Sequence, residues 1–149
     1  MLIILTIIFF LVDFCSKLLV SNLIGVHDSI VVINKFFNIS YFRNTGGAWS
    51  ILSNHTWLLI VFSLLIIVFI IGYIRKNKVN KRLELIGYSM ILGGSIGNLF
   101  DRIVYGYVID FLDFNIFGYS FPIFNLADTF IVLGVFMLLF DSFRGKRNV

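Results

Sequence analysis

Charged residues are scarce in this chain. Asp, Glu, Lys and Arg make up 13% of its 149 residues, whereas hydrophobic residues make up 59%. An ordinary soluble domain has about 25% charged and about 45–50% apolar residues, so the composition excludes that class and indicates a membrane protein. Because about 20 apolar residues cross the hydrocarbon layer once, this length accommodates about four spans, which we expect to form a single domain.

Cysteine, histidine and proline are scarce as well. The single cysteine, Cys15, excludes an intramolecular disulfide. The two histidines, His27 and His55, are at no spacing typical of metal ligands, so the sequence predicts neither a metal site nor a cofactor. No serine or cysteine nucleophile has a candidate histidine partner, which favours acid–base chemistry on water over covalent catalysis.

Positive charge exceeds negative charge, with 12 Lys and Arg against 8 Asp and Glu. Most of the basic residues are in two short clusters that flank apolar segments, at residues 75–82 and 144–147. Such clusters remain on the cytoplasmic side of a membrane. We therefore interpret the excess as a topology signal and expect no nucleic acid partner.

Four apolar segments predict transmembrane helices, at about residues 2–24, 56–74, 83–105 and 122–142. We interpret the first as a retained helix rather than a signal peptide, because its apolar pattern continues to spanning length. The fourth is expected to begin at Pro122, since the first turn of a helix tolerates a residue without an N–H. With both basic clusters inside, the N- and C-termini are predicted to be cytoplasmic.

Two regions between the spans have a different pattern. Residues 25–55 alternate Val and Ile with small and polar residues, which predicts two or three short strands outside the membrane. A Gly46-Gly47 pair in this region allows a tight turn. Residues 105–121 contain seven aromatic side chains, which predicts an outer loop in the headgroup region.

Polar side chains are energetically costly in the hydrocarbon layer, so those within the predicted spans are expected to have a structural or functional role. Asp13 and Lys17 are four residues apart in the favourable order for an ion pair, and we expect the pair to face the bundle interior. Gly93 and Gly97 form a G-x-x-x-G pair, which predicts a close approach of the helices that carry Asp101 and Asp128. One face of the third span combines small and polar residues, namely Gly94, Gly97, Asn98 and Asp101.

Four carboxylates are predicted near the outer side of the membrane: Asp101, Asp110, Asp113 and Asp128. Like charges at short range prevent two acids from ionising together, so one acid of a pair retains its proton. The ionised acid can then deprotonate water while the protonated one polarises a carbonyl, which is peptide hydrolysis by an aspartic dyad. Spacing alone leaves the choice among the acids open. Asp128 is near a helix N-terminus, which favours its ionised form.

Two other functions are compatible with intramembrane acids. A small proton-coupled transporter subunit also uses them, but its charged residues should recur along a path through the whole membrane. Here they gather at the outer side, apart from Asp13 and Lys17, and residues 56–74 contain none. A structural assembly factor would need the acids for stability and not for hydrolysis.

Five short motifs follow one another along the four-span plan: Asp13 with Lys17, then residues 44–48, 93–102, 108–111 and 121–128. In this combination the chain resembles the lipoprotein signal peptidases, the type II signal peptidases of bacteria, over nearly its whole length. The resemblance implies an aspartic endopeptidase of the bacterial cytoplasmic (inner) membrane, with its active site near the outer leaflet. Such an enzyme cleaves the signal peptide from diacylglyceryl-modified prolipoproteins on the N-terminal side of the lipidated cysteine.

The resemblance also implies roles for particular residues. The catalytic acids correspond to Asp110 and Asp128, and the structural polar pair to Asp13 and Lys17. Residues that shape the site or bind substrate correspond to Asn44, Gly46, Ala48, Asn98, Asp101, Arg102, Asn125 and Ala127. The implied fold is an all-α membrane protein with four transmembrane helices and a small extracytoplasmic β-cradle. Membrane lipids and globomycin-type inhibitors are the further partners that the resemblance implies.

Overall fold

The computed structural model describes residues 1–47, 51–53 and 55–146. Its elements, in chain order, are α1 (Leu2–Leu23), β1 (Ser29–Ile33), β2 (Phe37–Asn44), α2 (Thr56–Lys76), α3 (Arg82–Tyr105), β3 (Val108–Ile116), β4 (Tyr119–Ser120) and α4 (Leu126–Lys146). All four of these helices are long and apolar enough to cross a membrane. The four predicted spans thus correspond to four helices, and the strands predicted after the first span are present as β1 and β2.

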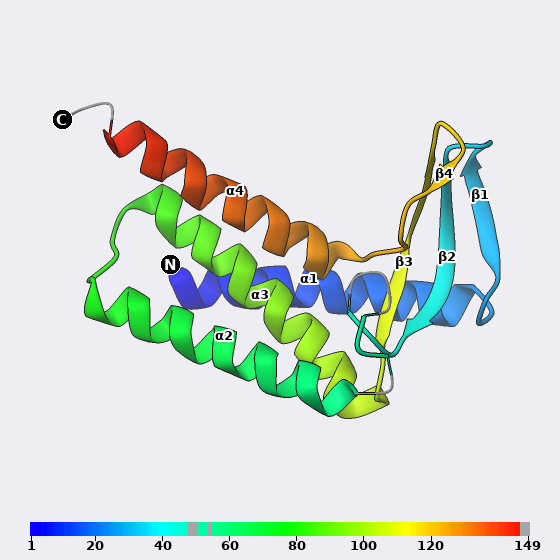
Figure 1. The fold of residues 1–149 in the computed structure, drawn as a ribbon, viewed down its shortest axis with the longest axis horizontal. Helices are drawn as coiled ribbons and strands as arrows, with labels where there is room; N and C mark the ends of the chain where they lie inside the picture. The colour runs from blue at the N-terminus through cyan, green and yellow to red at the C-terminus, as the bar shows by residue number, and fades with distance from the viewer. Residues whose placement is uncertain (48–50, 54, 147–149) are drawn as a thin grey trace.

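α3 is the central element of the bundle. It packs against each of the other three helices, and Figure 1 shows it between α2 and α4 with α1 behind it. Within its apolar stretch 61% of the residues are buried, compared with 11–17% for the other three spans. Most side chains of α1, α2 and α4 therefore point outward, which is stable in a bilayer because lipid tails are as apolar as the side chains.

Glycines on α3 set how closely α4 approaches. A Cβ on Gly94 would collide with the carbonyl oxygen of Ala127, and a Cβ on Gly87 would lie 3.1 Å from the carbonyl oxygen of Gly134. On each helix the two positions are two turns apart, so they lie in one seam. Small residues along this seam allow the two backbones to come into contact.

The predicted close approach of α3 and α4 is present, but the prediction is wrong for Gly93, which does not lie in the seam with α4. A Cβ on Gly93 would lie 2.6 Å from Cβ of Phe9, so this glycine faces α1. Gly97 lies where α1 and α4 both meet α3, since its Cβ would collide with Asp13 and lie 3.6 Å from Cβ of Ala127. Successive helical residues rotate by about 100°, so adjacent glycines serve different neighbours.

The strands form one antiparallel sheet in the order β1-β2-β3-β4, which Figure 1 shows across one end of the bundle. β3 and β4 occupy residues for which the sequence predicted an aromatic loop, so that prediction is wrong. The aromatic segment is a hairpin because β2 offers β3 a partner strand. Phe117 and Gly118, with φ of 52° and 83°, make the two-residue turn that closes it.

α4 begins at Leu126 rather than at Pro122, which corrects the predicted start of the fourth span. Of the residues just before it, Phe124 makes an isolated bridge with Leu112 of β3. The Phe124 N–H donates to the Leu112 carbonyl at 3.2 Å, and the Phe124 carbonyl accepts from the Leu112 N–H at 2.7 Å. Asp128 consequently lies in the first turn of α4 and not further along it.

The interior of the bundle near the sheet is polar. Buried apolar residues form one cluster between α1 and the sheet and a second between α2 and α3. The largest fully buried side chains, by contrast, are mostly charged or polar: Lys17, Val108, Asn125, Asp13, Asp101, Asp110 and Ser89. Buried polar groups are stable only with partners, and these partners build the site described next.

Candidate active site

Asn125 precedes α4 and caps its first turn. Its side-chain oxygen accepts the Asp128 backbone N–H at 3.0 Å, and the Asp128 carboxylate accepts the Asn125 backbone N–H at 3.4 Å. This reciprocal arrangement supplies partners for two N–H groups that have none within the helix. It fixes the Asp128 carboxylate beside the positive end of the α4 dipole.

Asp110 lies on β3 and is held from two sides. Its Oδ1 accepts a hydrogen bond from Nδ2 of Asn125 at 2.7 Å, and its Oδ2 accepts one from Nδ2 of Asn44 at 2.8 Å. Asn125 therefore contacts Asp110 through its amide nitrogen and Asp128 through its amide oxygen. One amide thus sets the positions of both acids.

Asn98 on α3 links Asp128 to a buried cation. Its Nδ2 donates to Oδ1 of Asp128 at 2.7 Å, while its Oδ1 accepts from Nζ of Lys17 at 3.0 Å and from Nδ2 of Asn125 at 3.2 Å. The amide nitrogen faces an acceptor and the amide oxygen faces donors. A flipped amide would place its NH2 group against the donors of Lys17 and Asn125. The orientation of Asn98 is therefore determined by its neighbours.

Lys17 is the centre of a buried charge cluster. Its Nζ lies 2.8 Å from Oδ2 of Asp13 and 3.0 Å from Oδ2 of Asp101. The other oxygen of Asp13 accepts the Ala127 backbone N–H at 2.8 Å, and Asp101 accepts the Ile109 N–H at 3.2 Å. Two carboxylates thus share one buried cation, and the cluster joins α1 to the start of α4 and α3 to β3.

Arg102 forms a hydrogen bond with the loop that follows β2. Its Nη2 donates to the Gly46 carbonyl at 3.1 Å and its Nη1 to the Asn98 carbonyl at 3.4 Å. Within the described part of the chain its buried Nε has no hydrogen-bond partner. The Gly46 N–H donates to Oδ1 of Asn44 at 2.9 Å, so the loop also positions Asn44. Ala48, the next predicted site residue, lies outside the described residues.

Asp110 and Asp128 both line a cavity of about 410 Å³. Its other polar walls come from Asn44, Asn98 and Arg102, and its apolar walls from β3, the connection before α4 and the first turns of α4. A second cavity of about 340 Å³ shares part of this lining and continues towards β4. The two acids are thus presented to a space with room for a short stretch of peptide.

Asp110 has a strongly shifted acidity. Burial, and after it the negative charge of Asp128, raise the pKa of Asp110 from 3.8 to about 7, against the opposing hydrogen bonds from Asn44 and Asn125. Only 2% of Asp110 is exposed to solvent. A carboxyl group with this pKa retains its proton for much of the time at neutral pH, so the pair can hold one proton between two acids.

The other two candidate acids do not line the cavity. Within the sheet, Oδ2 of Asp113 accepts hydrogen bonds from Nδ2 of Asn38 at 3.1 Å and from Oγ of Ser40 at 3.0 Å. Asp101 is paired with Lys17. Of the four candidate acids, Asp110 and Asp128 are therefore the two that line this cavity.

The structure brings most of the predicted site residues together in two shells. Those on the cavity are Asn44, Asn98, Arg102, Asp110 and Asp128. Those that hold the cavity residues from behind are Asp13, Lys17, Gly46, Asp101, Asn125 and Ala127. The sequence analysis missed the apolar wall, which includes Val108, Val132 and Leu133, and it missed the neighbouring Thr129. Val132 follows Asp128 by about one helical turn, so helical spacing contained that signal.

These features define a class of protein. Four membrane-spanning helices are capped at one end by a small sheet, and two carboxylates that differ in environment face one cavity. Residues 1–47, 51–53 and 55–146 contain no group of three or more His, Cys, Asp or Glu side chains arranged to hold a metal ion. The class is an integral membrane protein with an aspartate pair suited to acid–base chemistry on water.

Comparison with known proteins gives the family. The family model described as Signal peptidase (SPase) II matches residues 5–144. The lipoprotein signal peptidase of Aeromonas hydrophila is 40% identical, with 97% of this chain and 89% of that protein covered. The lipoprotein signal peptidase of Staphylococcus haemolyticus is 38% identical, with 93% and 87% covered. The chain belongs to the signal peptidase II family and is therefore a bacterial membrane peptidase of the aspartic class.

Solved structures agree with this fold. One bacterial membrane enzyme determined by the in meso method has a TM-score of 0.90 at 31% identity, covering 99% of this chain and 90% of that one. Another has a TM-score of 0.84 at 32% identity, covering 95% and 91%. Nothing in these comparisons favours the transporter subunit or the assembly factor that the sequence analysis considered.

Proposed function

We propose that this peptidase cleaves prolipoproteins that carry a diacylglyceryl group on a cysteine, on the N-terminal side of that cysteine. The relatives named lipoprotein signal peptidase support this substrate class. The observation that carries the proposed chemistry is that Asp110 and Asp128 line one cavity and are joined through Asn125. Water is the second reactant.

Asp128 is the base in this proposal. It lies in the first turn of α4, at the positive end of the helix dipole, and accepts a hydrogen bond from Asn98. It takes a proton from water while the water oxygen attacks the carbonyl carbon of the scissile peptide bond. Asp110, whose pKa is about 7, starts protonated and gives its proton to the carbonyl oxygen. The product of this step is a neutral tetrahedral diol.

Collapse of the diol completes the reaction. Protonated Asp128 gives its proton to the amide nitrogen, the carbon–nitrogen bond breaks, and one diol hydroxyl returns its proton to Asp110. The nitrogen becomes the new N-terminal amine of the lipidated cysteine, and the signal peptide leaves with a new carboxyl group. Both acids end in the protonation states in which they began, so no cofactor is consumed.

The cavity wall on α4 supports a route for the lipid part of the substrate. Val132 and Leu133 line the cavity and are 52% and 47% exposed. In our proposal the peptide lies against the polar walls, and the diacylglyceryl chains pass along these side chains into the bilayer. Apolar chains are stable there because they remain in contact with lipid and with apolar side chains.

The orientation in the membrane is also a proposal. Figure 1 shows the start of α1, the end of α4 and the α2–α3 connection at the end of the bundle opposite the sheet. The basic residues 75–82 are at this end, and such clusters stay in the cytoplasm. The termini are then cytoplasmic, and the sheet and cavity are near the outer leaflet of the bacterial cytoplasmic membrane.

Cleavage of a synthetic precursor tests the catalytic assignment. The purified protein in detergent is incubated with a diacylglyceryl-modified precursor peptide, and the products are identified by mass spectrometry. We expect Asp110→Asn and Asp128→Asn to reduce cleavage to background. Asp113→Asn is the matched control, because it removes a carboxylate of β3 that binds Asn38 and Ser40 away from the cavity. Undiminished cleavage by either of the first two variants removes that acid from the mechanism.

The same assay tests the substrate and the inhibitor. An unmodified precursor of identical sequence should be cleaved much more slowly than the lipidated one. Globomycin, a cyclic peptide, should block cleavage by occupying the cavity beside Asp110 and Asp128. Equal cleavage of both precursors would contradict the proposed substrate class.

A further inference from the structure

Arg43 lies on the face of the sheet that turns away from the catalytic cavity. Successive side chains of a strand point to opposite faces, and the next residue of β2, Asn44, reaches Asp110 in the cavity. The Arg43 guanidinium carbon lies 4.8 Å from the ring centre of Tyr107 and 5.6 Å from that of Tyr41, and its Nε is 3.4 Å from the Tyr41 hydroxyl. Arg43 is exposed and, in the described part of the chain, takes part in no ion pair.

A continuous row of aromatic rings leads from Arg43 along the seam between α1 and α3. Tyr107 stacks on Tyr105 at 6.0 Å, and Tyr105 meets Phe100 at 6.4 Å. Phe100 meets Phe14 at 5.4 Å and Phe10 at 5.9 Å, both on α1. We call these five residues the aromatic row. None is fully buried, so the row forms part of the outer surface of the bundle.

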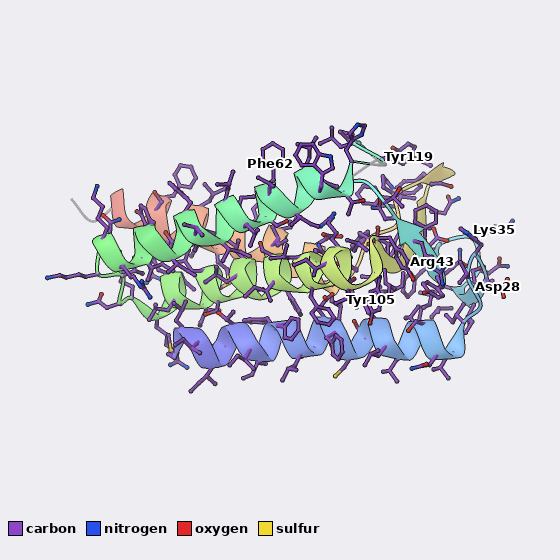
Figure 2. The ribbon with its side chains drawn as sticks, turned by 90° about the horizontal axis from the view of Figure 1, so that it is seen from below. Asp28, Lys35, Arg43, Phe62, Tyr105 and Tyr119 are labelled. Carbon is purple, nitrogen blue, oxygen red and sulfur yellow. The ribbon has the colours of Figure 1, made fainter. Side chains whose placement is uncertain are left out.

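The upper end of the row is at the level where a membrane changes from hydrocarbon to headgroups. Tyr105 is the last residue of α3, a membrane-spanning helix. Figure 2 shows Tyr105 beside α1, with Arg43 close by at the base of the sheet. Tyrosine is enriched at this level of membrane proteins. The planar guanidinium fork of arginine is matched to the oxygens of a phosphate group.

We propose that Arg43, with Tyr41 and Tyr107, binds the phosphodiester of an anionic membrane phospholipid. One acyl chain of this lipid lies along the aromatic row. The stacked rings orient the guanidinium without neutralising it, so its charge is available to an anion. Among the residues that the structure describes, no acid is within ion-pair distance of Arg43 to attract the cationic headgroup of a zwitterionic lipid. The lipid site lies on the other face of the sheet from the peptidase cavity and does not depend on the proposed function.

Lipid selectivity measured by native mass spectrometry tests the site. Wild type in a mild detergent is titrated with equal amounts of short-chain phosphatidylglycerol and phosphatidylcholine, without peptide substrate, and the ratio of the two bound lipids is recorded. We expect Arg43→Gln to lower the preference for phosphatidylglycerol about tenfold or more, as for loss of a charge-assisted hydrogen bond. Lys35→Gln is the matched control, since it removes an equal charge from the exposed β1–β2 turn. It should lower the preference at most about fivefold, the general attraction of one surface cation.

Equal losses in the Arg43→Gln and Lys35→Gln variants would overturn the site in favour of diffuse electrostatic attraction. Arg43→Lys, which keeps the charge but not the planar fork, is the second variant, and it guards against a fold defect in Arg43→Gln. An intermediate loss of selectivity supports the site, and unchanged selectivity overturns it. Glycerol 3-phosphate added to wild type should not compete with the lipid, because it lacks the acyl chain that the aromatic row contacts. Efficient competition would overturn the lipid part of the proposal.

Discussion

Replacing Asp110 with Asn should change how the stability of the protein depends on pH. The pKa of Asp110 is about 7 in the folded protein, against an ordinary value of 3.8. Below pH 3.8 the folded and unfolded chains both bind this proton, and between 3.8 and 7 only the folded chain retains it. The free energy of unfolding therefore falls by about 1.36 kcal/mol per pH unit as pH rises through this window. The loss totals about 4 kcal/mol by pH 8.

The Asp110→Asn variant has no ionisable group at this position and lacks this contribution. Its stability relative to wild type should therefore rise by about 4 kcal/mol between pH 4 and pH 8, even though we expect the variant to lose activity. For a chain of about 150 residues 1 kcal/mol corresponds to about 2–4 °C in Tm, so the difference in Tm should change by about 8–16 °C. Asp110, the acid that we assign to catalysis, therefore destabilises the folded protein at neutral pH.

Thermal unfolding in detergent, followed by intrinsic fluorescence at several values between pH 4 and pH 8, measures this difference. Asp113→Asn is compared in parallel, because Asp113 lies on the same strand but accepts hydrogen bonds from Asn38 and Ser40. A difference in Tm between wild type and Asp110→Asn that stays constant across this range would refute the reasoning. So would an equal pH-dependent change in Asp113→Asn.

Three further variants test the supports of the site. Asn125→Ala removes the cap of α4 and a hydrogen bond to Asp110; Tm should fall with a loss of about 1–2 kcal/mol, and cleavage should fall to near background. Lys17→Met leaves two buried carboxylates without their cation, so thermal unfolding should show a loss of about 3–5 kcal/mol; an unchanged Tm would contradict the described charge cluster. Thr56→Val removes the hydroxyl that donates to the Thr45 and Gly106 carbonyls at 3.3 and 3.2 Å. We expect kcat/KM to fall several-fold, which corresponds to about 1 kcal/mol. Thr56→Ser, which keeps the hydroxyl, should restore kcat/KM.

The four helices were predictable because a membrane imposes a simple length rule on apolar segments. The start of α4 was not, because Pro122 is compatible both with a first helical turn and with an extended strand. The backbone pairing of Phe124 with Leu112 decides between these two conformations. Leu112 is on β3, so the deciding contact is with a residue outside the local sequence. Local propensity cannot detect a partner strand that lies elsewhere in the fold.

The hairpin of β3 and β4 was missed for a related reason. Its aromatic residues fit a membrane interface and a β-strand equally well, and only the register with β2 distinguishes the two. The glycine seam was misplaced because three helices pack against α3. A small-residue motif indicates that some helix approaches, but the rotation of about 100° per residue decides which one.

The candidate acids were only partly predictable. Spacing placed several carboxylates near the same end of the bundle, and the family resemblance singled out Asp110 and Asp128. The structure adds the reason that Asp113 differs from Asp110: its carboxylate is occupied by Asn38 and Ser40. The double contact of Asn125 with both acids had no sequence signal beyond its position three residues before Asp128, because it depends on β3 lying against the start of α4.

The buried cation has a consequence for the order in which the protein is made. Asp13 and Lys17 are on adjacent turns of α1, so their ion pair can form while α1 is the only helix in the bilayer. The remaining partners come later in the chain, with Asp101 on α3 and the Ala127 N–H on α4. When α3 is inserted, its Asp101 therefore meets a lysine that Asp13 already balances. The cavity is completed only when the last helix arrives, because Asp128, Val132 and Leu133 of its wall are on α4.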